Sequence, residues 1–150
     1  MTLLRVDDLC TTFGGDRPAV DGVSFDIAAG ETFCLVGESG SGKSMLALSI
    51  LGLTPGGLEE IRKGSSIRFR GEELVGTGEG RFRSVRGGGI AVVFQEPMTS
   101  LNPVLSIGTQ VRESVELHQP LRGTGAQEAA VRLLSEVGIQ DAEARFGEYP

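Results

Sequence analysis

The most constraining feature of this sequence is a glycine-rich stretch, Gly37-Glu38-Ser39-Gly40-Ser41-Gly42-Lys43-Ser44. It fits G-x-x-x-x-G-K-[ST], the pattern of a phosphate-binding loop (P-loop). An apolar run typical of a buried strand precedes it at residues 32–36, and a helical run follows at residues 45–51. Because the motif requires a strand, a glycine loop and a helix N-terminus in that order, this context argues against a chance match in a glycine-rich chain.

The residue types of the stretch suit a phosphate group. Glycines let the backbone curl so that several N–H groups face one concavity, and the new helix adds unpaired N–H groups and the positive end of its dipole. Lys43 offers an ammonium group to the β- and γ-phosphates, and the Ser44 hydroxyl can ligate Mg²⁺. Charge-assisted hydrogen bonds contribute about 1.5–3 kcal/mol each. We therefore predict that residues 37–44 and the following Met45 bind a nucleotide with Mg²⁺.

Composition excludes several function classes. The chain has 150 residues, 39% of them hydrophobic, which predicts a globular domain. A formal net charge of −6 argues against nucleic-acid binding through a basic face. Cys10 and Cys34 lack metal-ligand spacing and suit a reducing compartment, with Cys34 expected as a small core residue. No signal peptide and no apolar run of membrane-spanning length is apparent.

Alternating or continuous apolar patterns predict five strands, at residues 3–9, 23–27, 32–36, 67–71 and 90–94. Short turns join the early strands, which favours antiparallel pairing, with Val23, Phe25 and Ile27 facing inward. The unbroken apolar run at residues 90–94 predicts a central strand covered on both faces.

Helices are expected after the P-loop and in the last third of the chain. The first should end near Gly52, and the second should span residues 106–117. A third should start with a capping box at Thr124 and Gln127, continue with the apolar stripe Ala130, Leu133, Leu134 and Val137, and stop at Gly138. The Gly- and Arg-rich residues 76–89 predict a surface loop with a short helical turn, and His118 a solvated position.

Several stretches together resemble the ATP-binding subunit of an ABC transporter. They are residues 19–25 with Gly30-Glu31, residues 36–44, and Val93-Phe94-Gln95-Glu96-Pro97-Met98-Thr99-Ser100-Leu101-Asn102-Pro103. The last stretch resembles the dipeptide/oligopeptide importer branch, although related branches carry nickel or other solutes. The resemblance extends over nearly the whole chain. It implies an α/β fold of the ABC-type P-loop NTPases, truncated, with an antiparallel β subdomain and P-loop core in residues 1–95 and an incomplete helical subdomain in residues 96–150.

The resemblance also implies roles for individual residues. Phe13 falls where the family stacks an aromatic ring on adenine, and Val20 where a small apolar residue touches the same ring. Gln95 matches the glutamine that reaches Mg²⁺ and the attacking water, so Gln95 and Lys43 are the candidate catalytic residues, and Ser44 and Gln95 the metal ligands. The plain alternatives are that Phe13 pins a loop and that Gln95 makes a strand-end hydrogen bond. The implied cofactors are ATP and Mg²⁺.

The implied partners are transmembrane permease subunits, contacted through residues 95–103, and a second ATP-binding subunit that is identical or different. No nucleic acid is expected. The implied location is peripheral, at the cytoplasmic face of the cell membrane, in a transporter that imports peptides.

The chain departs from the family in what it does not contain. The signature motif, the strand ending in a catalytic glutamate, and the switch histidine are missing, so the chain resembles the N-terminal portion of such a subunit. The parallel strands that flank the P-loop strand are missing too, so residues 90–94 and the helix after the P-loop should be poorly covered. We expect weak nucleotide binding without turnover by the isolated chain. A non-catalytic nucleotide-binding fragment remains an alternative; a P-loop kinase or GTPase lacks support, since no N-K-x-D run or basic lid is present.

Overall fold

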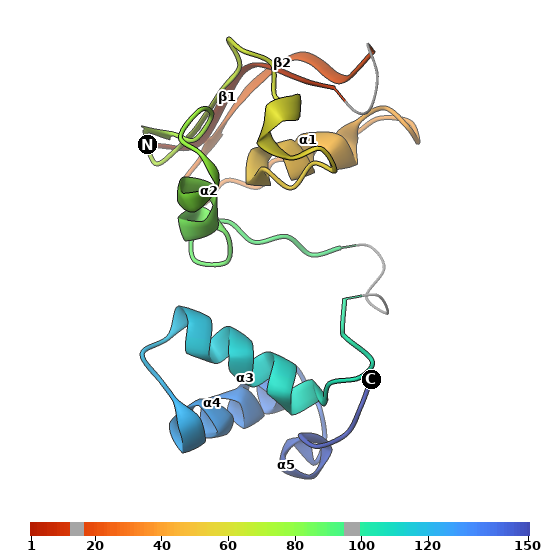
Figure 1. Cartoon of the computed structure of the whole chain (residues 1–150), viewed down its shortest axis with the longest axis vertical. Coiled ribbons are helices and arrows are strands. Elements are labelled where there is room, and N and C mark those ends of the chain that lie inside the picture. The colour runs from red at the N-terminus through yellow and green to blue at the C-terminus, as the bar shows by residue number, and fades with distance from the viewer. Residues whose placement is uncertain (13–16, 95–99) are drawn as a thin grey trace. The chain divides into compact units, whose positions relative to one another are not determined.

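A computed structural model describes residues 1–12, 17–94 and 100–150 of the chain. These residues form two compact units, Met1–Ile90 and Ala91–Pro150 (Figure 1). Phe13 and Gln95, for which the resemblance implies roles in binding adenine and Mg²⁺, lie outside the described residues.

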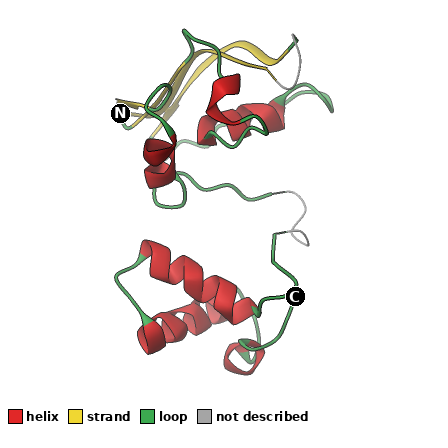
Figure 2. Cartoon of the chain, viewed as in Figure 1, coloured by secondary structure: helices red, strands yellow, loops and turns green. Residues whose placement is uncertain are grey.

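The first unit contains a four-stranded antiparallel sheet with strand order β2-β1-β3-β4. Its strands, yellow in Figure 2, are β1 (Thr2–Thr12), β2 (Pro18–Ala28), β3 (Ser66–Phe69) and β4 (Glu72–Glu73). The predicted antiparallel pairing of the early strands is confirmed, with Val6 opposite Phe25. Both long strands extend beyond the predicted bounds. The inward orientation of Val23, Phe25 and Ile27 is confirmed as well, since all three pack partly buried against the core.

Helices of the first unit pack against this sheet through a shared apolar core. They are α1 (Lys43–Leu51), the 3₁₀ helix η1 (Gly57–Glu60) and α2 (Glu79–Val85). α1 stops as predicted, because Gly52 takes a left-handed φ of 61° and the Leu53 N–H donates to Leu48 O at 2.8 Å. The core comprises Leu4, Val6, Leu9, Val20, Leu46, Ile61, Ile67, Phe69, Leu74, Phe82 and Val85.

The expectation for residues 76–89 was partly wrong. The helical turn exists as α2, but it is not confined to the surface. Phe82 is 1% exposed and Val85 6% exposed, and both belong to the core. Their spacing of three residues places them on one face of the helix, a signal that the glycine and arginine content of the segment obscured.

Two predicted buried strands do not form. Residues 32–36 and 91–94 form no strand, although Ile90 makes an isolated β-bridge to Arg86. Val36 is 86% exposed and Val93 97% exposed, and Cys34, expected in the core, is exposed. A parallel strand is stable only with paired neighbours and covered faces, and within the described residues no strand pairs with either run. Phe33 instead stacks on Phe25 of β2, with ring centroids 4.9 Å apart.

The second unit is helical, with α3 (Ile107–His118), α4 (Gly123–Glu136) and the short α5 (Ala142–Arg145). The predicted helix at residues 106–117 is confirmed: Ser106 caps it, its Oγ accepting the Thr109 N–H at 3.3 Å. His118 is exposed, as predicted. The core of this unit is Val115, Ala126, Ala129 and Ala130.

The expected details of α4 were right at its end and wrong at its start. The Schellman stop is confirmed, since Gly138 has a φ of 86° and the Ile139 N–H donates to Leu134 O at 3.0 Å. The capping box does not form, because the helix already begins at Gly123 and places Thr124 inside its first turn. Leu133 and Val137, expected in the apolar stripe, are 40% and 76% exposed, because the small Ala126 and Ala129 occupy the buried face instead.

Among the described residues, no helix combines the length and the apolar composition needed to cross a membrane.

Candidate phosphate-binding site

The P-loop residues form an exposed turn that leads into α1. The Ser41 N–H donates to Glu38 O at 3.2 Å, which closes a four-residue turn. Gly40, in the third position of this turn, has a φ of 80°, and Gly42, at the N-cap of α1, has a φ of 90°. Both values lie in the left-handed region that glycine adopts without strain, so the glycines of the motif meet a real backbone requirement.

Gly42 is also required by packing against β2. A Cβ atom at this position would lie 2.2 Å from the backbone oxygen of Ala19. The P-loop therefore approaches the β2 backbone more closely than any side chain would permit. The sequence motif predicts a glycine here for phosphate binding, and the structure adds a second reason that the motif does not express.

The start of α1 leaves backbone donors available. The first bond within the helix runs from the Leu46 N–H to Gly42 O, at 2.8 Å. The N–H groups of Lys43, Ser44 and Met45 precede it and have no acceptor within the helix. Together with the helix dipole, they form a cradle for an anion. The residues of the predicted phosphate site, including Met45, thus meet at one helix end.

The Lys43 side chain folds back over the loop. Its Nζ donates to Gly37 O at 2.7 Å and to Glu38 O at 2.6 Å, and lies 3.2 Å from Ser41 Oγ. The ammonium group is thereby held at the loop itself. A phosphate bound there would replace these neutral acceptors with a charged one, which makes the stronger hydrogen bond.

A hollow of about 410 Å³ lies between β2 and the P-loop. Val20 and Val23 of β2 line it together with Leu35, Gly37 and Lys43. Val20 is 4% exposed, and the structure brings it to the same hollow as the loop. Its predicted contact with adenine remains a prediction.

The described residues offer a limited donor set for Mg²⁺. They contain no cluster of three or more His, Cys, Asp or Glu side chains that could hold a metal ion. The Ser44 side chain is exposed at the start of α1, beside the N–H cradle. One hydroxyl suits Mg²⁺ when phosphate oxygens and waters complete the shell. Ser44 therefore fits the predicted role only jointly with a bound phosphate.

Two contacts that the sequence did not indicate hold α1 in place, one to Thr11 and one to Arg86. Ser49, which is fully buried, donates to Met45 O at 2.6 Å and lies 2.9 Å from the hydroxyl of Thr11 in β1. Arg86 donates from Nε to Leu51 O at 2.7 Å. The available signal was slight: one serine in an otherwise apolar helix and one of several arginines in a glycine-rich stretch.

The described part of the predicted partner surface, residues 100–103, is tied to α3. Gln110 accepts the Asn102 N–H at 2.8 Å and donates to Asn102 O and Leu105 O, each at 3.0 Å. The Asn102 side chain in turn accepts the Val104 N–H at 3.0 Å. Sequence reasoning missed Gln110, because one amide in a helix carries no distinguishing pattern.

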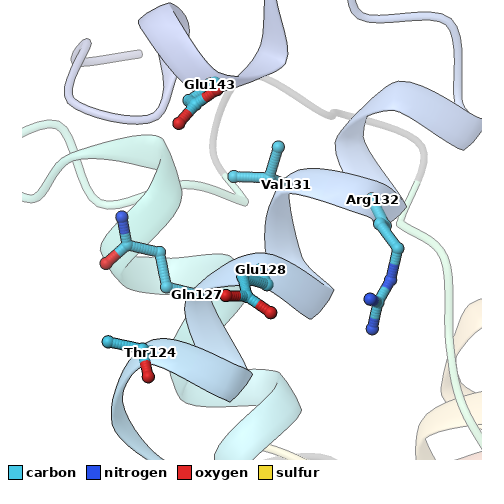
Figure 3. Close-up of a pocket in the computed structure, with 6 residues that line it drawn as sticks. All are labelled: Thr124, Gln127, Glu128, Val131, Arg132 and Glu143. Atoms are coloured by element: carbon cyan, nitrogen blue, oxygen red, sulfur yellow. The ribbon is translucent and has the colours of Figure 1, made fainter.

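A hollow of about 440 Å³ lies on the second unit, shown in Figure 3. It is lined by Thr124, Gln127, Glu128, Val131, Arg132 and Glu143, and Glu143 comes from a different helix than the other five. All of these except Val131 are exposed. The hollow is slightly larger than the one beside the P-loop, but it has no glycine loop and no buried polar group. We therefore assign the candidate site to the P-loop.

Known proteins resemble the chain in sequence and in fold. A family model described as "ABC transporter" matches residues 20–149. A protein of Brucella abortus (strain 2308), named as a peptide import ATP-binding protein, is 48% identical over 99% of this chain and 45% of its own length. The oligopeptide transport ATP-binding protein AppD of Bacillus subtilis (strain 168) is 46% identical over 99% of this chain and 46% of its own length. The chain thus spans less than half the length of these relatives.

A solved structure shares the fold. It is the ATP-binding cassette MJ0796, in a dimeric, post-hydrolysis state bound to ADP and Pi. The TM-score is 0.77 at 20% sequence identity, over 97% of this chain and 60% of that one. The family match over most of the chain, the relatives and the common fold lead to one conclusion: this chain belongs to the ABC transporter family.

Proposed function

We propose that the chain is the part of an ABC transporter's ATP-binding subunit that binds the phosphates of ATP. The observation that carries this proposal is that the Lys43 ammonium group lies at the same loop as the N–H groups of residues 43–45, which have no acceptor within α1. Charge-assisted bonds from these groups, at about 1.5–3 kcal/mol each, suffice to hold the phosphates of ATP. The names of the relatives, which are ATP-binding proteins, support the choice of nucleotide.

The adenine base would lie in the hollow beside β2. Val20 and Val23 offer an apolar wall there, and Phe13 would stack on the ring. Stacking contributes only about 0.5–1.5 kcal/mol beyond area burial. We therefore expect phosphate contacts to dominate affinity, and discrimination between bases to be modest.

In the intact subunit the proposed reaction is attack of water on the γ-phosphate of ATP. Lys43 stabilises the charge that develops on the phosphate oxygens, and Gln95 orients the attacking water. Ser44 would hold Mg²⁺ together with Gln95, and the bound ion would neutralise phosphate charge. No residue of this chain is assigned as the catalytic base, so we propose that the 150-residue chain alone binds ATP without turnover.

The proposed partners are a permease subunit and a second ATP-binding subunit. Membership of the family and the segment before α3 support them. Residues 95–103 would contact a permease subunit, and Gln110 keeps the described part of this segment in a fixed shape. A second ATP-binding subunit would complete the nucleotide site. The relatives' names favour a peptide as the transported substrate, and a peripheral position at the cytoplasmic face of the membrane follows from the permease contact.

Titration of Mg-ATP into the purified chain tests whether the P-loop binds the phosphates of ATP. Lys43→Ala should weaken binding by about tenfold or more, because it removes a charge-assisted contact. Lys63→Ala is a matched control, since Lys63 is the other lysine of the chain and is exposed. Equal affinity of the wild-type chain and Lys43→Ala would refute the proposal.

A phosphate-release assay separates the binding fragment from an active enzyme. The chain alone should release no phosphate above the level of Lys43→Ala. Release that the wild-type chain shows and Lys43→Ala abolishes would contradict the proposed absence of turnover, while leaving the nucleotide site in place.

A further inference from the structure

The C-terminal end of α1 is bound by an arginine from α2's own C-terminus. Arg86 donates from Nε to Leu51 O at 2.7 Å and from one terminal nitrogen to Gly52 O at 2.8 Å. These are backbone carbonyls at the end of the helix, where no further N–H group of the helix can reach them. A cation at this end also interacts favourably with the negative end of the helix dipole.

Arg86 is itself held in a defined orientation. Its terminal nitrogens donate to the two carboxylate oxygens of Glu79, at 2.5 Å and 3.2 Å. Its guanidinium carbon lies 5.8 Å from the ring centre of the buried Phe82, and its side chain is 22% exposed. The hydrogen bond from Arg86 lowers the pKa of Glu79, so the carboxylate stays charged at neutral pH.

The contacts of α1 matter for the position of the P-loop, because the segment that leads into the loop pairs with no described strand. Residues 32–36 form no strand and are exposed. The P-loop is therefore fixed from the helix side, at three points. Gly42 abuts Ala19 of β2, Ser49 meets Thr11 of β1, and Arg86 holds the far end.

We propose that Arg86 is a positioning residue for the phosphate-binding loop. It does not reach the nucleotide; it fixes the location of α1 along its axis, and thereby the N–H groups of residues 43–45 at the other end. Its effect on ATP affinity rests on the proposed nucleotide-binding function. Lysine cannot replace it, since a single ammonium group lacks the planar fork that joins two carbonyls and a carboxylate.

The test compares Arg86→Lys with Arg83→Lys, an identical change at an exposed residue in the last turn of α2, which Arg86 follows. Two quantities are measured on each folded variant: backbone amide chemical shifts of residues 42–45 without nucleotide, and the Kd for Mg-ATP. We expect Arg86→Lys to move these amide signals and to raise the Kd about three- to tenfold. Arg83→Lys should change neither. Glu79→Gln, which removes the charge that orients Arg86, should act in the same direction and serves if Arg86→Lys does not fold.

The outcomes distinguish the two proposals. A lower melting temperature of Arg86→Lys with unchanged amide shifts and unchanged Kd would mean a purely structural role, and would overturn the inference. Shifted amides in a chain whose wild type binds no Mg-ATP would support the positioning role and overturn the proposed function. Equal effects of the Arg86 and Arg83 variants would also contradict the inference.

Discussion

Strand β1 and residues 32–36 each carry an apolar pattern that predicts a strand, but only β1 forms one. Val6 in β1 is 1% exposed, whereas Val36 is 86% exposed. β1 pairs with β2 on one edge and with β3 on the other, while residues 32–36 pair with no described strand. A β pattern therefore becomes a buried strand only where partners for both its edges and its faces exist.

The candidate phosphate site lies between these two regions in the sequence. Its entry comes from the unpaired residues 32–36, and its exit is α1, which packs on the sheet through Leu46 and Ser49. The position of the loop is thus fixed by the packing of α1 on the sheet, and not by residues 32–36.

Truncation of a buried side chain should separate the two regions most clearly. Ile67→Ala removes a fully buried side chain of β3 and should lower the free energy of unfolding by about 2–5 kcal/mol. Val36→Ala, in the exposed run, should change it by about 0.5 kcal/mol or less. Urea unfolding of both variants measures the difference. Similar losses would mean that residues 32–36 are packed as well as the sheet.

A methyl group at the loop should reveal how closely β2 supports it. Gly42→Ala places a Cβ atom 2.2 Å from Ala19 O at a φ of 90°, which should cost about 1–3 kcal/mol or more of folding free energy and displace the loop. Gly30→Ala is the control, because Gly30 has a φ of 78° but no atom within 4 Å of the added carbon. Thermal unfolding of both variants isolates the steric contribution to the lost stability. Equal losses of stability in the two variants would show that contact with Ala19 contributes nothing.

Glu73 should give the sheet a measurable acid sensitivity. Burial opposes its ionisation, but hydrogen bonds from the Ser66 hydroxyl and from the N–H groups of Ile67 and Val75 outweigh this and lower its pKa below 4.5. Since the folded pKa is the lower one, its stabilisation is present at neutral pH and is lost as the pH falls below about 4.5 through the folded value.

The matching variant is Glu73→Gln. At neutral pH it should lose about 1 kcal/mol, a modest value because the Glu73 side chain is 35% exposed. The difference from the wild type should shrink on acidification, as followed by urea unfolding between neutral and acidic pH. A difference that stays constant with pH would contradict the role of the carboxylate.

Chemical modification of the two cysteines perturbs the chain least and compares the two regions directly. Cys34 lies in the unpaired run and is exposed, whereas Cys10 in β1 is buried. A thiol reagent should modify Cys34 rapidly and Cys10 only on unfolding, without loss of the folded state. Cys34→Ser should abolish the rapid phase. A slow reaction at both residues would show that residues 32–36 are covered.

Features that depend on neighbours in sequence were predictable. The P-loop, the β1–β2 pairing, the end of α1 at Gly52 and the stop at Gly138 each follow from a local pattern. Features that depend on distant partners were not. The expected burial of Cys34 required strands that no described segment supplies. The capping box at Thr124 was a local error, because the helix begins one residue earlier, at Gly123.

The same limit applies to the candidate site. The motif predicts residues 37–44 as the phosphate site, since the chemistry of a phosphate cradle is encoded in consecutive residues. It could not show Ala19 against Gly42 or Arg86 at the far end of α1, because those contacts join segments 23 and 34 residues apart. The support of the site is therefore a tertiary property, while its chemistry is local.

Amide hydrogen exchange with and without Mg-ATP tests the central claim most directly, namely that the N-terminal N–H groups of α1 bind phosphate. We expect nucleotide to slow exchange at Lys43, Ser44 and Met45, while the Val6 amide in β1 is protected in both states. Unchanged exchange at residues 43–45 under conditions that saturate binding would contradict it, and would place the nucleotide elsewhere on the chain.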